Sequence, residues 1–204
     1  MTPNNLLRLC DELIEKGNKE EARKVARGIS ILTQQPAWQQ AYDFIIDEQS
    51  PDDYISVRRI EINESIKDEL NELHDKNGLE YKNQSLRHGT QVDLTNNEFF
   101  RNWLSSFSSN FIGIWTSRLQ KGGYHVNHIH PRGQQSHVYY IDVPDNTSGH
   151  LQFGVPRFST TIKPAKTIIP EMGILVSFPC WLWHGVSVYN GKKPRLTIAF
   201  DTFQ

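Results

Sequence analysis

The feature that most limits the fold is the pattern of apolar and turn-forming residues in the C-terminal half of the chain. From Thr116 onward, short apolar runs alternate with clusters of turn-forming residues such as Pro144-Asp145-Asn146. Many short strands divided by Gly, Pro and Asn are typical of an antiparallel sandwich or barrel. Because these runs do not alternate with helical segments, a doubly wound parallel sheet is not expected. The runs that predict strands are 138–143, 151–155, 173–178, 185–188 and 195–200.

Residues 4–48 have the periodicity of helices instead. Gly17-Asn18 separates two amphipathic stretches, and Pro36 ends the second before a third stretch at 37–46. A helix pair of this kind is similar to one tetratricopeptide unit. We therefore predict a helical arm, 1–48, followed by a β domain, 49–204. The apolar residues of the arm form two stripes: Leu6, Leu7, Cys10, Leu13 and Ile14 in the first helix, and Ala22, Val25, Ala26, Ile29 and Leu32 in the second.

The second stripe must be covered by something, because one helical unit cannot bury both of its faces. No second copy of the unit is visible in the sequence. The cover is the β domain, a second copy of the chain or a partner protein. We accordingly expect either an arm packed on the β domain, or a homodimer or protein partner bound through the N-terminal helices.

Residues 50–114 contain both strand-like and helix-like patterns. The alternation over 54–62 predicts a strand, and the periodicity of 66–76 and of 99–114 predicts two helices. The polar stretch 84–91 has little core signal and predicts a loop. Binding loops on a rigid scaffold are often polar, so this loop is a candidate substrate clamp or lid, the alternative being a solvated connector. Its candidate substrate residues are Arg87, His88 and Gln91.

Composition argues against several classes of protein. No run of 18 apolar residues predicts a transmembrane helix, and the N-terminus lacks the apolar core of a secretory signal. The formal net charge of −1 gives no field that would favour nucleic acid or an anionic membrane. Two cysteines cannot form a disulfide framework. We therefore expect a cytoplasmic protein with neither a nucleic-acid nor a membrane partner.

Histidines are concentrated in one short segment. Four of the eight are His125, His128, His130 and His137, and His184 follows much later. In a strand, His128 and His130 would point to the same face, as two ligands of one metal ion must. Imidazole suits iron, zinc, copper and nickel. The spacing predicts a metal site, the alternative being a set of core histidines.

An arginine and a hydroxyl follow the last of these histidines. Arg195 and Thr197 lie two residues apart, on one face of the last predicted strand. A guanidinium with a neighbouring hydroxyl is suited to bind a carboxylate. The alternative for Arg195 is an exposed charge on a strand.

In this order, the motifs resemble those of the iron(II)/2-oxoglutarate-dependent oxygenases. That family has an HxD/E pair, a distal His and an Arg, often as RxS or RxT; here these read His128-Ile129-His130, His184 and Arg195-Leu196-Thr197. The chain is most similar to a subfamily with H-x-H-P followed by S-x-x-Y-Y, some members of which are fused to tetratricopeptide repeats. The resemblance runs from about residue 80 to the end, and its matching segments are 84–87, 89–91, 123–131, 136–140, 178–179 and 184–186.

The resemblance implies a mainly β protein with helices, built on a jelly-roll (double-stranded β-helix) core. It implies Fe(II) bound by His128, His130 and His184, and 2-oxoglutarate bound by Arg195 and Thr197. Tyr139 and Tyr140 point to opposite faces of one strand, so only one of them can face the pocket. We favour Tyr140 as a weaker candidate, because a tyrosine in the pocket could form a hydrogen bond with the cosubstrate. The implied reaction hydroxylates, or otherwise oxidises, a small molecule or peptide and releases succinate and CO₂.

His130 departs from the family pattern, since it stands where the family has a carboxylate ligand. Either three imidazoles bind the metal, or His130 points away and leaves two histidines and water. Iron halogenases also lack the carboxylate, but a small residue replaces it there, whereas an imidazole would fill the gap. Two other functions stay open: a three-His cupin-type dioxygenase that does not use 2-oxoglutarate, and a non-catalytic binding module.

Overall fold

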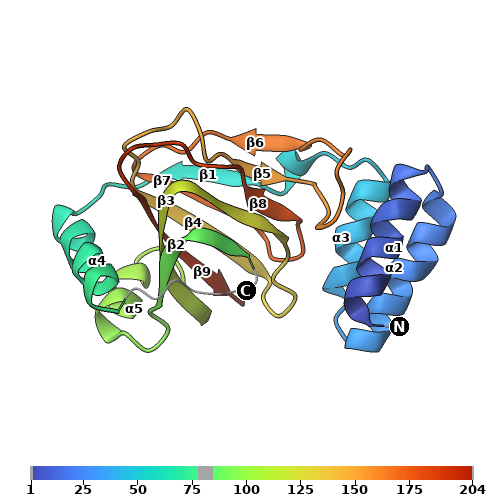
Figure 1. Ribbon diagram of the computed structural model, residues 1–204. Helices are drawn as coiled ribbons and strands as arrows, with labels where there is room; N and C mark the ends of the chain where they lie inside the picture. The colour runs from blue at the N-terminus through green and yellow to red at the C-terminus, as the bar shows by residue number, and fades with distance from the viewer. Residues whose placement is uncertain (1, 78–84, 204) are drawn as a thin grey trace.

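The computed structural model describes residues 2–77 and 85–203. Three helices at the N-terminus form the arm, and two more lie at the other end of the sheet (Figure 1). The helices are α1 (Pro3–Glu15), α2 (Lys19–Thr33), α3 (Ala37–Ile46), α4 (Glu64–Asn77) and α5 (Glu98–Leu104), with a short 3₁₀ turn at Pro51–Asp53. None of the described helices is both long and apolar enough to cross a membrane.

The remaining elements form a curled antiparallel sheet, so the fold is mainly β with a jelly-roll-like core. Its order is β1-β7-β4-β9-β3-β8-β5-β6, and β2 pairs with the other edge of β3. The strands are β1 (Ser56–Arg59), β2 (Leu86–Asp93), β3 (Phe111–His128), β4 (Gln135–Asp142), β5 (Leu151–Phe153), β6 (Lys166–Ile168), β7 (Ile174–Pro179), β8 (His184–Val186) and β9 (Arg195–Thr202).

The long strand β3 joins the two halves of this sheet. Its first part, from Phe111 to Leu119, pairs with β9, and its last part, from His125 to His128, pairs with β8. Gly122 lies between the two parts with φ +81°, a left-handed backbone conformation that glycine adopts without steric cost. The strand therefore carries the chain from the main layer to the short layer that holds β8, β5 and β6.

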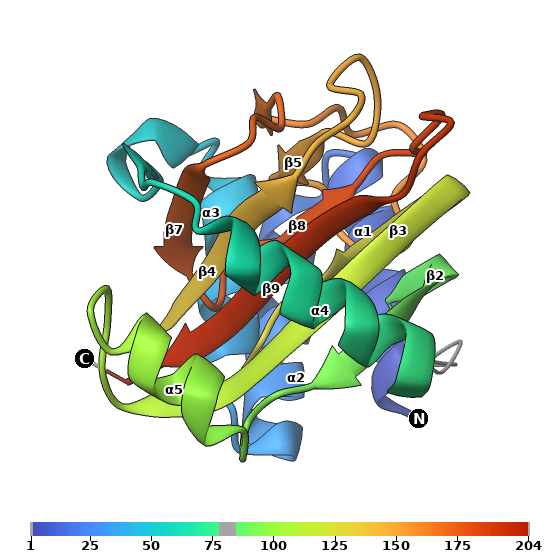
Figure 2. The same ribbon diagram turned by 90° about the vertical axis from the view of Figure 1, so that its left-hand side faces the viewer.

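Helices α4 and α5 cover the outer face of the main layer (Figure 2). Leu70 of α4 and Phe100 of α5 are fully buried against strand residues such as Ile114 and Phe200. The amphipathic pattern of both helices thus supplies the apolar cover that one side of a sheet needs.

His74 fastens α4 to the sheet below it. This buried imidazole lies 2.9 Å from the Thr90 hydroxyl through Nδ1 and 3.1 Å from the Thr116 hydroxyl through Nε2. Burial lowers the pKa of His74 to about 4, and the charge of Arg118 acts in the same direction. The folded protein therefore holds this ring neutral in a pH range where the unfolded chain protonates it.

We expect metal-free protein to lose stability as the pH falls from about 6.5 towards 4, because only the unfolded chain takes up a proton at His74 in this window. Between pH 6.5 and 5.5, the His74 contribution falls by about 1 kcal/mol. In urea titrations at these two pH values, His74→Gln should lose less stability than wild type by this amount. His88→Asn, which replaces an exposed ring, serves as the control. An equal loss in wild type and His74→Gln would contradict the assignment.

The arm packs on the β domain through Trp183, which is 1% exposed. The Trp183 ring centroid lies 5.9 Å from that of Trp38 and 5.6 Å from that of Tyr42, both in α3. Apart from Leu32, which is 58% exposed, the apolar residues of the α1 and α2 stripes belong to the same cluster or pack against it, and the cluster includes Ile129. Its own β domain therefore covers the arm. The domain boundary at residue 48, and a second copy or partner protein at these helices, stay predictions.

The prediction of a loop over 84–91 is wrong for the residues that the structure describes, since 86–93 form β2. A β-bulge between Arg87 and Gly89, with φ +50° at His88, breaks the two-residue periodicity by which a strand is recognised. The helix predicted over 99–114 is correct only in its first part, because α5 ends at Leu104 and β3 begins at Phe111.

Candidate metal and cosubstrate site

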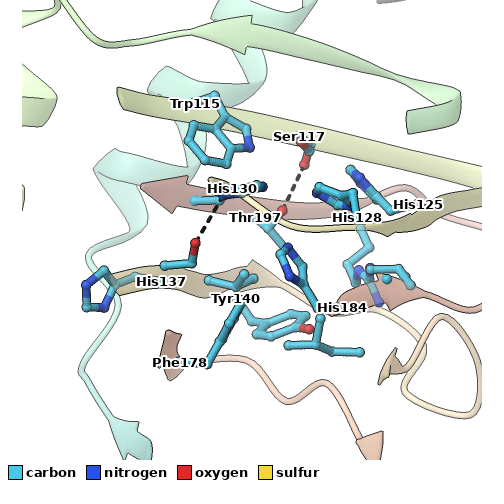
Figure 3. A pocket seen from close by; sticks show the side chains of 17 residues that line it. Trp115, Ser117, His125, His128, His130, His137, Tyr140, Phe178, His184 and Thr197 are labelled. Carbon is cyan, nitrogen blue, oxygen red and sulfur yellow. Dashed lines mark hydrogen bonds between the residues drawn. The ribbon is translucent and has the colours of Figure 1, made fainter. Parts of the chain in front are cut away.

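Three histidines meet where β3 and β8 run side by side. His128 ends β3 and is the register partner of His184, which begins β8, while His130 follows two residues after His128. The ring centroids are 4.4 Å apart for His128 and His184, and 5.0 Å apart for His130 and each of the others. One ligand atom from each lies within 4.8 Å of the other two. Figure 3 shows the rings facing one space, so His130 does not point away from the pair.

Each ring has its Nδ1 engaged on the side away from this space. Nδ1 of His128 lies 2.7 Å from the Val126 carbonyl oxygen, and Nδ1 of His184 lies 2.9 Å from that of Leu182. Nδ1 of His130 lies 2.9 Å from a carboxylate oxygen of Asp201. Carbonyl and ionised carboxylate oxygens only accept hydrogen bonds, so each Nδ1 carries a proton and, in the neutral ring, Nε2 keeps its lone pair. Three imidazole lone pairs are therefore available to one metal ion.

Burial keeps two of these rings neutral at physiological pH. It lowers the pKa of His184 to about 3, with the neighbouring His130 acting in the same direction. Burial and the neighbouring histidines lower the pKa of His128 well below its ordinary value. Neutral imidazole is the form that binds a metal, so these rings need not lose a proton first.

The carboxylate of Asp201 lies directly behind His130 but is not one of the three candidate ligands. Asp201 accepts hydrogen bonds from His130 and, at 2.6 Å, from the hydroxyl of Ser136. Burial alone would raise the pKa of Asp201, but its interactions with His130 and Ser136 hold it below the ordinary value. An anion behind a ligating imidazole fixes the tautomer and makes the ring a better donor.

A pocket runs from the histidines to Arg195. Arg195 is 3% exposed, and its Nη1 donates to the Gly149 carbonyl oxygen. Its Nε is buried without a hydrogen-bond partner, and no carboxylate pairs with the guanidinium in the part of the chain that the structure describes. A buried cation in this state is costly unless an anion binds to it. The pocket thus fits a molecule with a carboxylate at its far end.

Thr197 and Tyr140 line the same pocket. The Thr197 hydroxyl donates to the Ser117 carbonyl oxygen at 3.4 Å, and the Tyr140 ring centroid lies 5.4 Å from the Arg195 guanidinium carbon. Tyr139 points to the other face, where its hydroxyl donates to the carbonyl oxygens of Ile60 and Glu61. The pocket therefore offers a cation at one end and three imidazoles at the other, which is the chemistry that a dicarboxylate and a metal ion need.

His125 and His137, the other members of the histidine cluster, have different surroundings. His137 lies 2.8 Å from the Ser177 hydroxyl and 3.3 Å from that of Thr202, so it is a satisfied core histidine at the edge of the pocket. His125 has no hydrogen-bond partner among the described residues and lines both this pocket and the next one. Burial, together with the charge of Arg195, lowers the pKa of His125 to about 3. A neutral imidazole therefore stands between the two pockets.

The second pocket lies on the outer side of the histidines, and we call it the mouth pocket. Besides His125, His128 and His130, its lining includes Trp38, Ser85, Gln91, Trp115, Arg157, Trp183 and Asp201. Of the three candidate substrate residues, Gln91 lines the mouth pocket, whereas Arg87 and His88 are exposed and do not line it. Sequence reasoning missed Trp38, Arg157 and Asp201, which lie outside the motifs and reach the site only through the fold.

Part of the chain matches a known protein family. A family model described as "Putative 2OG-Fe(II) oxygenase" matches residues 113–201, from β3 into β9. This segment contains the three histidines, Arg195 and Thr197. Comparison with curated protein sequences gives no match.

Solved structures share the fold. A prolyl-4-hydroxylase from Pseudomonas putida has a TM-score of 0.55 at 13% identity, over 79% of this chain and 96% of its own. A prolyl hydroxylase from Trichoplax adhaerens, in complex with a hypoxia inducible factor peptide, has a TM-score of 0.53 at 12% identity, over 79% of this chain and 86% of its own. The segment 113–201 is therefore similar to the 2OG-Fe(II) oxygenases, a family that uses Fe(II) and 2-oxoglutarate.

Proposed function

We propose that the protein is an iron(II)- and 2-oxoglutarate-dependent dioxygenase that hydroxylates, or otherwise oxidises, an organic substrate and releases succinate and CO₂. The observation that carries this proposal is the pairing of three free imidazole lone pairs with a pocket that ends at an uncompensated Arg195. The two solved structures described above are named prolyl hydroxylases, so hydroxylation of a C–H bond is the reaction that we propose first.

The residues of the chain bind, orient and exclude water. His128, His130 and His184 would hold the iron through Nε2, and Asp201 would orient His130. Arg195 and Thr197 would bind the far carboxylate of 2-oxoglutarate. When bound, the iron supplies activation of O₂ coupled to oxidative decarboxylation of the cosubstrate. Apolar rings such as Phe178, whose centroid lies 4.7 Å from that of His184, would keep water out of the pocket.

Succinate formation tests this proposal. Protein loaded anaerobically with Fe(II) and 2-oxoglutarate, and then exposed to O₂, should form succinate in repeated turnovers, measured by mass spectrometry. His184→Ala should reduce the yield to that of iron in buffer. No succinate above this background would contradict the proposal.

The same experiment separates the two alternatives. Since His130 replaces the usual carboxylate, a three-His dioxygenase that needs no 2-oxoglutarate is the second candidate function. It would bind iron but form no succinate. A non-catalytic module would form none either, and would not retain iron through His128 and His184.

A further inference from the structure

One wall of the mouth pocket combines Trp38 of the N-terminal arm with residues of the segment 113–201 that the family model matches. Trp38 of α3 and Arg157 of the 156–162 loop line it together with Trp115 and Trp183. All of these residues share the pocket with His128 and His130, so a molecule bound there lies next to the proposed metal position. The shape and chemistry of this wall therefore bear on the choice of substrate.

Arg157 brings an uncompensated positive charge to the mouth pocket. The guanidinium carbon of Arg157 lies 5.7 Å from the centroid of the Phe158 ring. Within the described ranges, the Arg157 side chain forms no ion pair or hydrogen bond. Asp201, the one carboxylate among the described lining residues, is engaged by His130 and Ser136. The arginine guanidinium is positively charged, and that of Arg157 is half-buried, so an anion is the ligand that balances its charge.

Helix α1 holds the loop that carries Arg157. Oδ2 of Asp11 accepts the Phe158 N–H at 2.8 Å, while its Oδ1 accepts the Tyr42 hydroxyl at 2.6 Å. Oε1 of Glu15 accepts the Ser159 hydroxyl at 2.6 Å and the Thr160 N–H at 2.9 Å. Both carboxylates thus bind the backbone and hydroxyls of the loop rather than Arg157. The arm fixes the loop and leaves the guanidinium available, which lowers the cost of ordering when a ligand binds.

Aromatic rings make up the rest of the wall. The Trp38 and Trp183 centroids are 5.9 Å apart, and the Trp115 centroid lies 5.4 Å from that of His130. Indole faces bind flat or ring-shaped apolar groups, with a contribution from dispersion and area burial. A cation among indoles therefore fits a molecule that has an apolar body and one negative group.

From this geometry we infer that the substrate carries an oxyanion, a carboxylate in the simplest case, which pairs with Arg157 while its apolar body lies against the aromatic wall of the mouth pocket. The inference rests on the proposed function, because only a dioxygenase would oxidise the bound molecule, but the binding itself does not need iron. Two sources supply such a group: a free organic acid and an acidic side chain of a peptide.

Titration calorimetry with charge-matched probes tests the inference on the full-length protein. The small probes are N-acetylphenylalanine and its neutral amide. The peptide probes are a blocked pentapeptide with a central glutamate between two phenylalanines, and its glutamine counterpart. Each is titrated into metal-free protein, and into protein with Zn(II) and 2-oxoglutarate, in which the Arg195 pocket is filled. We expect one acid probe to bind at least about tenfold more tightly than its neutral partner.

Arg157→Gln should abolish this preference for the acid, and Arg157→Lys should restore part of it. Arg8→Gln is the matched control, because the Arg8 guanidinium lies 4.2 Å from the same Phe158 ring but does not line the mouth pocket. Trp38→Ala should weaken the acid and its neutral partner by the same factor. The small pair or the peptide pair, whichever shows the preference, identifies the source of the oxyanion.

Two results would overturn the inference: no acid binds more tightly than its neutral partner, or the preference persists in Arg157→Gln. Failure of the proposed function gives a different pattern. In that case 2-oxoglutarate yields no succinate, while the acid preference and its dependence on Arg157 persist in metal-free protein.

Discussion

Replacing His184 with alanine should prevent the protein from retaining iron. His184 supplies one of three imidazole lone pairs, and its ring is oriented by the Leu182 carbonyl oxygen. Loss of residues that merely orient a ligand costs roughly 10–100-fold in metal affinity, so loss of the ligand itself should cost more. After anaerobic loading and dialysis, elemental analysis should find stoichiometric iron in wild type and none in His184→Ala. His128→Ala should behave in the same way.

His88→Asn is the control for this experiment, since it removes an exposed imidazole on β2 and asparagine tolerates the positive φ of that position. Circular dichroism of each variant shows whether the fold is intact. Stoichiometric iron in a folded His184→Ala protein would exclude the three-histidine site.

Replacing Arg195 with lysine should weaken the binding of 2-oxoglutarate by roughly 10–100-fold, the scale of about 1–3 kcal/mol for a charge-assisted hydrogen bond. Lysine keeps the positive charge but cannot present two parallel N–H groups to a carboxylate. The buried, unpartnered Nε of Arg195 is the donor that the substitution removes. Anaerobic titration calorimetry of 2-oxoglutarate into Mn(II)-loaded protein measures the change.

Arg118→Lys is a closely matched control. Arg118 lies on β3, opposite Leu196 of β9, and its Nε is also buried without a partner among the described residues. It pairs with Asp75 and does not line the pocket, so its replacement should leave cosubstrate affinity unchanged. Equal affinity in wild type and Arg195→Lys would remove Arg195 from the cosubstrate site.

The sequence predicts those parts of the fold that depend on local pattern. The three helices of the arm and α4 follow from apolar periodicity, and most strands after Thr116 follow from short runs between turns. Strand β2 was missed because its bulge shifts the alternation by one residue. Strand β6, only three residues long, carries too little pattern to be recognised.

The candidate site divides in the same way. The motif residues His128, His130, His184 and Arg195 line one pocket, as their order in the motif indicates. The strand expected through His128 and His130 ends at His128, so the tertiary fold brings His130 to the pocket. Asp201 and Arg157 carry no local signal. Asp201 accepts a hydrogen bond from His130, 71 residues away, and the loop of Arg157 is held through Phe158 by Asp11, 147 residues from Phe158. Only the tertiary structure brings such contacts together.

The position of Trp183 has a consequence for synthesis of the chain. The arm emerges from the ribosome before the β domain, but the ring that completes its apolar cluster lies far downstream of it in the chain. At typical translation rates, the chain between Ile46 and Trp183 takes on the order of ten seconds to emerge. During this interval the apolar face of the nascent arm is uncovered, and such a surface is a binding site for a chaperone. Folding of the helices into their final packing must therefore wait until Trp183 has emerged.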